Sequence, residues 1–165
     1  MSAPETETLD DTRLIATFLL GEGLFGIDTA LIQEVVKVGA LTPVHHAPGY
    51  VMGIRNLRGK IVTVIDLQAR LELGVADLTD ESRVLIVENG GEPVGLVVDG
   101  VSDTIAMNSA EIKPPPPGLH GIQGRNLLGV HRSGDRLIAL LDSTVILQAE
   151  EERSDDLAIK EQKLP

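Results

Sequence analysis

Short apolar segments recur along the chain and are separated by turn residues. Seven of them are rich in Val, Ile and Leu and are bounded by Gly, Pro or Asn-Gly: LIATFLL, LFGID, KIVTVIDL, RVLIVE, PVGLVVD, LLGVH and RLIALLD. Many short segments with this composition and punctuation are typical of strands in barrels or sandwiches. Two short helical segments are expected near residues 29–36 and 143–148. The pattern predicts an all-β fold with few short helices.

The apolar pattern occurs twice, in the same order. GIRNLRGKIVTVIDLQARL (53–71) aligns without gaps on GVHRSGDRLIALLDSTVIL (129–147), and FGIDTALIQEVV (25–36) aligns on VGLVVDGVSDTI (94–105). Such self-similarity indicates a repeated structural unit. We expect two similar β subdomains over 13–80 and 81–148, with a disordered N-terminal arm over 1–12 and a charged C-terminal tail over 149–165. Asp66 and Asp142 follow the equivalent apolar strands, where each is expected to cap a short helix.

Composition narrows the class of protein. The 165 residues include 14 Lys and Arg against 25 Asp and Glu, so the formal net charge is -11, and there is no cysteine. With only two Phe, one Tyr and no Trp, the chain lacks the cationic face and the stacking side chains of a nucleic-acid binder. No apolar run is long enough to span a membrane, and the N-terminus lacks a signal-peptide pattern. We therefore expect a cytoplasmic protein that neither binds nucleic acid nor inserts into a membrane.

Candidate catalytic and metal-binding motifs are few. GEGLFG (21–26) fits a dinucleotide-binding fingerprint, but a strand pattern follows it and no acidic residue stands about 20 positions later. We interpret it as a hairpin turn, with a dinucleotide-binding enzyme as the alternative from another class. The histidines lack metal-ligand spacing and are expected in loops or at the surface: His45, His46, His120 and His131. PPPP (114–117) is interpreted as a rigid spacer.

The charges are unevenly distributed. Between Val35 and Ile65 the chain contains no acid but four cations, namely Lys37, Arg55, Arg58 and Lys60. One interpretation is that strands and loops simply carry few acids. The other is a local cationic surface that meets an acidic partner, and such a surface acts on encounter and orientation more than on affinity.

Three segments resemble the CheW family, the coupling adaptors of bacterial chemotaxis. They are FGIDTALIQEVV, TPVHHAPGYVMGIRNLRGKIVTVIDLQARL and VGLVVDGVSDTI, and the resemblance runs from about Leu14 to Leu147. It implies two five-stranded SH3-like β barrels side by side, and a scaffold that is not an enzyme and needs no cofactor or metal. It also implies two partners: the cytoplasmic domain of a methyl-accepting chemoreceptor and the regulatory domain of a chemotaxis histidine kinase.

The resemblance further implies two binding surfaces. In the receptor-facing groove, Ile32 would offer apolar contact to a receptor helix, Gly53 would allow close backbone approach, and Arg58 would orient against polar or acidic groups. The full receptor-facing set is Ile32, Glu34, Gly53, Asn56 and Arg58. The kinase-facing set, on the other barrel, is Val84, Val87, Val94, Val98 and Val101.

The chain departs from the usual family pattern at Arg55, Thr63 and Gln68. Thr63 suits a strand as well as the proline it replaces. Arg55 and Gln68 bear on partner identity, so a CheW-like scaffold for a non-flagellar pathway, such as pilus motility, stays as an alternative.

Overall fold

The computed structural model describes residues 11–147 of the chain. The charged tail predicted over 149–165, and residues 1–10 of the predicted arm, lie outside the described residues. Thr12, the last residue of the predicted arm, begins strand β1 (Thr12–Leu20) and pairs with Asn108. The sheet therefore begins inside the predicted arm.

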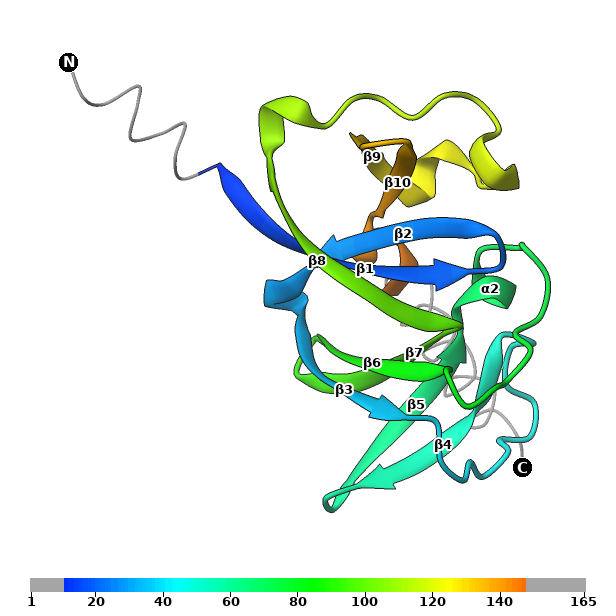
Figure 1. Cartoon of the computed structure of the whole chain (residues 1–165). Coiled ribbons are helices and arrows are strands. Elements are labelled where there is room, and N and C mark those ends of the chain that lie inside the picture. The colour runs from blue at the N-terminus through cyan, green and yellow to red at the C-terminus, as the bar shows by residue number, and fades with distance from the viewer. Residues whose placement is uncertain (1–10, 148–165) are drawn as a thin grey trace.

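The described strands form two five-stranded sheets (Figure 1). Barrel A has the order β8-β1-β2-β10-β9 and contains β1, β2 (Gly23–Asp28), β8 (Gly100–Asn108), β9 (Leu127–Ser133) and β10 (Arg136–Leu141). Barrel B has the order β3-β6-β7-β5-β4 and contains β3 (Ile32–Lys37), β4 (Val51–Leu57), β5 (Lys60–Asp66), β6 (Arg83–Asn89) and β7 (Glu92–Val98). The predicted all-β fold of two SH3-like barrels is confirmed.

The helices are short, as predicted, but one expected helix is wrong. Only η1 (Thr29–Leu31) lies within residues 29–36, and it passes directly into β3. The exposure of β3 alternates residue by residue, which is the period of a strand. The expected helix near 143–148 is present over 143–147. The other short helices are α2 (Leu67–Arg70), η2 (Ser109–Glu111), η3 (Leu119–Gly121) and η4 (Gly124–Asn126).

The two barrels do not divide the chain at residue 80. Barrel B is continuous from β3 to β7, whereas barrel A combines β1 and β2 with β8, β9 and β10 (Figure 1). Four strand pairs join the repeats: β1 with β8 and β3 with β6 are antiparallel, and β2 with β10 and β5 with β7 are parallel. Each barrel thus takes a hairpin from one repeat and three strands from the other. The predicted boundaries 13–80 and 81–148 are therefore wrong.

The repeat itself is present in the hydrogen bonds. The Asp66 N–H donates to the Tyr50 carbonyl at 2.7 Å, and the Asp142 N–H donates to the Asn126 carbonyl at 2.8 Å. Both aspartates also cap the helix that follows, as predicted. Asp66 accepts from the Ala69 N–H at 3.2 Å, and Asp142 accepts from the Thr144 N–H at 3.1 Å.

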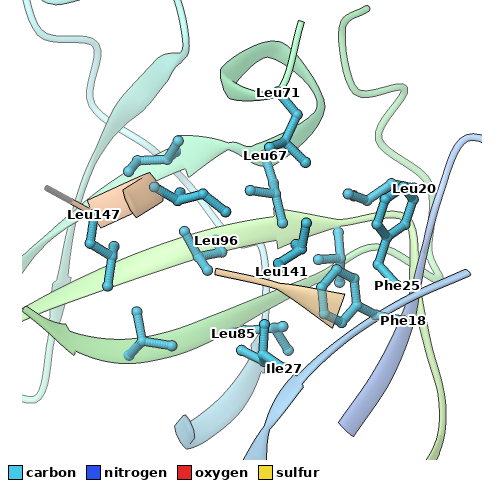
Figure 2. Close-up of a cluster of buried hydrophobic side chains, with 14 of the residues drawn as sticks. Phe18, Leu20, Phe25, Ile27, Leu67, Leu71, Leu85, Leu96, Leu141 and Leu147 are labelled. Carbon is cyan, nitrogen blue, oxygen red and sulfur yellow. The ribbon is translucent and has the colours of Figure 1, made fainter. Parts of the chain in front are cut away.

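The main hydrophobic core lies between the barrels. Figure 2 shows Phe18, Phe25 and Ile27 of barrel A facing side chains of barrel B such as Leu85 and Leu96. The barrel interiors hold smaller clusters, one around Ile138 in barrel A and one around Val64 in barrel B. Because most apolar burial is shared, the two barrels stabilise each other.

Candidate functional site

The β4–β5 turn carries a strained arginine. Arg58 and Gly59 have φ angles of 55° and 85°, as in a two-residue type I′ hairpin, and the Gly59 N–H donates to Asn56 Oδ1 at 2.9 Å. A non-glycine residue with positive φ is sterically disfavoured. The equivalent position of the other repeat is Gly134, with a φ of 62°. One repeat therefore uses the residue type that the turn favours, and the other keeps an arginine there.

The Arg58 guanidinium reaches across barrel B to Glu34 on β3. Its Nη2 donates to Glu34 Oε1 at 2.7 Å, and its Nη1 donates to Glu34 Oε2. Such bidentate pairs fix the orientation of both side chains. The Arg58 side chain is 72% exposed and that of Glu34 is 27% exposed. A partner can therefore reach a guanidinium that is already oriented.

The same contact keeps both groups charged. The hydrogen bond from Arg58 is the largest influence on the Glu34 carboxyl and lowers its pKa below the ordinary value of 4.5; desolvation opposes it, and the charges of Arg58 and Arg55 add to it. The hydrogen bond to Glu34 likewise raises the pKa of Arg58. At neutral pH this end of the barrel presents a fixed ion pair.

Two of the four cations between Val35 and Ile65 are engaged within the chain. Arg58 pairs with Glu34, and Arg55 Nη1 donates to the carbonyls of Lys37 at 2.6 Å and Val38 at 3.2 Å. The cationic surface suggested by the sequence is therefore narrower than the composition of this segment indicates.

Gly53 lies inside the fold. A Cβ atom there would lie 2.6 Å from the Thr42 carbonyl oxygen, and the Gly53 φ is 152°. Thr42 and Ile54 exchange backbone hydrogen bonds of 2.9 and 2.8 Å beside it. Gly53 does allow a close backbone approach, and within the chain the approaching segment is the loop that follows β3.

A groove lined by apolar and polar side chains lies at Leu31, the residue before Ile32. Ile32 is partly buried against the core between the barrels, and the preceding residue, Leu31, is 43% exposed. Two adjoining cavities of about 280 and 250 Å³ share Leu31, Ser143 and Thr144 as lining residues. Sequence reasoning missed these three residues. The signal that was available is Leu31 itself, an apolar residue next to Ile32.

The structure contradicts four of the five predicted kinase-facing residues. Val84, Val87, Val94 and Val98 are at most 5% exposed, so their side chains offer almost no surface to a partner in this conformation. They also lie on β6 and β7, in the same barrel as Glu34 and Arg58. Only Val101, which lies on β8 in barrel A and is 46% exposed, fits a direct contact on the other barrel.

The remaining candidate residues lie in a hairpin turn, on the surface or in the buried part of the fold. GEGLFG forms the β1–β2 hairpin, in which Leu20 pairs with Gly23, as predicted. His45 and His46 are exposed, but His131 is buried on β9, which contradicts the surface position expected for it. Within residues 11–147, no three metal-ligating side chains cluster, and no helix is both long and apolar enough to cross a membrane.

The PPPP segment lies between η2 and η3. Pro114 and Pro116 line a cavity of about 660 Å³ together with His131 and Leu137. The segment thus borders barrel A, a position that suits the predicted spacer.

Two packed barrels, with an exposed and oriented ion pair on one of them and a groove lined by Leu31, define a binding module. The chain belongs to the CheW family: the CheW-like domain matches residues 15–151. It is 37% identical over 147 residues to the chemotaxis protein CheW of Klebsiella aerogenes, covering 88% of this chain and 86% of that protein. It is 32% identical to protein FrzA of Myxococcus xanthus, covering 83% of this chain and 86% of that protein.

A solved structure agrees with the family. The scaffolding protein TtCheW from Thermoanaerobacter tengcongensis superimposes with a TM-score of 0.73 at 37% identity, covering 79% of this chain and 84% of that chain. These relatives identify the chain as a scaffold or adaptor of the chemotaxis type.

Proposed function

We propose that the chain is a non-enzymatic cytoplasmic adaptor that couples the cytoplasmic tip of a chemoreceptor to a chemotaxis histidine kinase. The observation that carries the proposal is the Arg58–Glu34 pair: an exposed, bidentate pair that begins on a strained turn. Strained backbone is retained mainly where the side chain it places has a function. Both residues belong to the set that the family resemblance assigns to receptor binding.

The receptor side has an apolar part and a charged part. The groove beside Leu31 and the partly buried Ile32 suits the apolar face of an amphipathic helix. Two residues further along β3, Glu34 holds the Arg58 guanidinium, which suits polar or acidic groups on the same helix. A receptor helix can therefore be recognised by both parts at once.

The kinase side is proposed on barrel A, around Val101. This residue is exposed at the surface of β8, whereas the valines of β6 and β7 are buried in the core. Placing the two partners on different barrels allows one adaptor to hold both together.

Substitution of Arg58 tests the receptor side. Arg58→Gly removes the side chain in a turn where glycine is favoured, so we expect a normal fold and a loss of receptor affinity of about 30-fold, as for a hot-spot arginine. Arg58→Glu should abolish receptor binding, and its melting temperature should stay within about 5 °C of that of the wild type. Lys60→Glu, a charge reversal at an exposed residue of the same turn region, serves as the matched control and should bind within about threefold of the wild type.

The double substitution Glu34→Arg with Arg58→Glu separates the internal ion pair from the contact of Arg58 with the receptor. If Arg58 contacts the receptor, the swap restores the internal ion pair but leaves receptor binding weak. Normal receptor binding by folded Arg58→Gly contradicts the receptor-facing assignment.

A second candidate is a CheW-like scaffold of a different pathway, because a relative of similar identity is named FrzA and not CheW. Binding assays with receptor and kinase pairs from each pathway of the same cell separate the two, because the adaptor should bind only its own pair tightly.

A further inference from the structure

The two end strands of barrel B, β3 and β4, are separated by a seam without ladder hydrogen bonds. In the described part of the chain, β3 pairs only with β6 and β4 pairs only with β5. The nearest backbone bridge joins Thr42 to Ile54, beyond the end of β3. Two side chains cross from β4 and its turn to the side of β3: Arg55 and Arg58.

The Arg55 side chain on β4 donates hydrogen bonds across this seam to the end of β3, and we call this contact the arginine clamp. Its Nη1 donates to the Lys37 carbonyl at 2.6 Å and to the Val38 carbonyl at 3.2 Å, which lie at and just after the end of β3. Gly39 makes room for the guanidinium: a Cβ atom there would lie 3.1 Å from Arg55 Cζ, and the Gly39 φ is 65°. The carbonyl groups at the end of β3 accept the hydrogen bonds of this clamp, and Gly39 leaves space for the guanidinium of Arg55.

The clamp adjoins the proposed receptor site. Arg58 crosses the same seam to Glu34, three residues before Lys37, and the charge of Arg55 contributes to the lowered pKa of Glu34. Arg55 therefore binds the end of the strand that carries Glu34, and its charge also acts on the Glu34 carboxyl.

The other repeat shows that the fold does not need the clamp. Gly53 and Gly129 are equivalent, because a Cβ atom added at either would lie 2.6 Å from a backbone carbonyl oxygen, so Arg55 corresponds to His131. The His131 Nδ1 atom is buried without a hydrogen-bond partner, and its Nε2 lies 3.7 Å from Glu111. A cavity of about 660 Å³ opens beside it in barrel A. The arginine clamp is thus specific to the seam that carries Glu34 and Arg58.

We propose that Arg55 is a positioning residue: it clamps β3 to β4 and thereby fixes the Glu34–Arg58 pair in the orientation that a receptor helix meets. This inference rests on the proposed function for its binding consequence, but its effect on Glu34 requires no partner. It also gives a physical role to a residue at which the chain departs from its family.

The test compares Arg55→Met with Arg55→Lys. The carboxyl pKa of Glu34 is measured by carbon-13 NMR titration, and the affinity for a purified receptor cytoplasmic domain is measured in parallel. In Arg55→Met the Glu34 pKa should rise towards its ordinary value, and receptor affinity should fall about tenfold, as for one lost charge-assisted contact. Arg55→Lys keeps a cationic donor, so its Glu34 pKa should stay close to that of the wild type and most of the affinity should return.

Lys37→Met is the control, because it removes one charge at the same seam from an exposed side chain and leaves the Lys37 carbonyl in place. Lys37→Met should change neither the pKa of Glu34 nor the receptor affinity. If Arg55→Met does not fold, Arg55→Gln, an uncharged variant that retains an amide donor, takes its place in both measurements.

An unchanged Glu34 pKa in the uncharged variant overturns the clamp and leaves the adaptor function standing. Absence of receptor binding by the wild-type chain overturns the adaptor function, and the NMR titration then still decides the clamp.

Discussion

The substitution Gly53→Ala separates a structural role from a binding role at one predicted site residue. The added Cβ atom would lie 2.6 Å from the Thr42 carbonyl oxygen and 3.0 Å from its carbon, and both are backbone atoms that cannot rotate away. The φ of 152° adds strain for any residue with a side chain. Overpacking costs about 1–3 kcal/mol and a disfavoured backbone conformation costs about 1–3 kcal/mol, so we expect a total loss of about 2–6 kcal/mol.

Urea and thermal unfolding of Gly53→Ala measure this cost. For a chain of this size the expected loss lowers the melting temperature by about 5–15 °C. Gly49→Ala is the matched control, because a Cβ atom at Gly49 would have no neighbour within 4 Å and the Gly49 φ is not positive, and it should be neutral within about 0.5 kcal/mol. At a temperature where Gly53→Ala is folded, it should bind receptor like the wild type. A Gly53→Ala protein that is as stable as Gly49→Ala refutes the account of this contact.

Three further outcomes are expected. Phe25→Ala empties a site between the barrels and should cost about 3–5 kcal/mol in urea unfolding, with one transition for both barrels; separate transitions would contradict the shared core. Asp66→Ala removes a buried carboxylate that accepts from two part-buried backbone N–H groups and should cost about 1–3 kcal/mol, more than the roughly 1 kcal/mol for the more exposed Asp142→Ala; the reverse order would refute the burial argument. Because the folded-state pKa of Glu34 is lowered, the pair with Arg58 contributes stability above about pH 4.5 that is lost as the pH falls through the folded-state pKa. The stability difference between wild type and Arg58→Gln should therefore shrink in acid, and a difference that is independent of pH would exclude this linkage.

The strands and the repeat were accessible from the sequence because they depend on local apolar patterns. The exchange of hairpins between the two repeats could not be predicted from the sequence. It depends on the pairing of β1 with β8, β2 with β10, β3 with β6 and β5 with β7, which join segments from different repeats. The same apolar pattern fits a hairpin that stays with its own repeat, so periodicity alone cannot choose between the two arrangements.

The buried valines had a signal in the sequence that went unused. Val84 to Val87 and Val94 to Val98 are continuous apolar runs without alternation, and such runs are typical of strands covered on both faces. The exposure of Val101 agrees with its position outside these runs.

The Arg58–Glu34 ion pair could not be predicted from the sequence in this way, because Glu34 and Arg58 are 24 residues apart and meet only through the closure of barrel B. The clamp formed by Arg55 depends on the same closure.

Co-sedimentation tests the adaptor function most directly. Membranes that contain the candidate receptor are mixed with the histidine kinase, with and without this chain, and the pelleted kinase is measured; Arg58→Gly serves as the matched variant. The account predicts that the chain binds each partner alone, and that the kinase pellets with receptor membranes only when the wild-type chain is present. Kinase that pellets equally without the chain, or equally with Arg58→Gly, would contradict it.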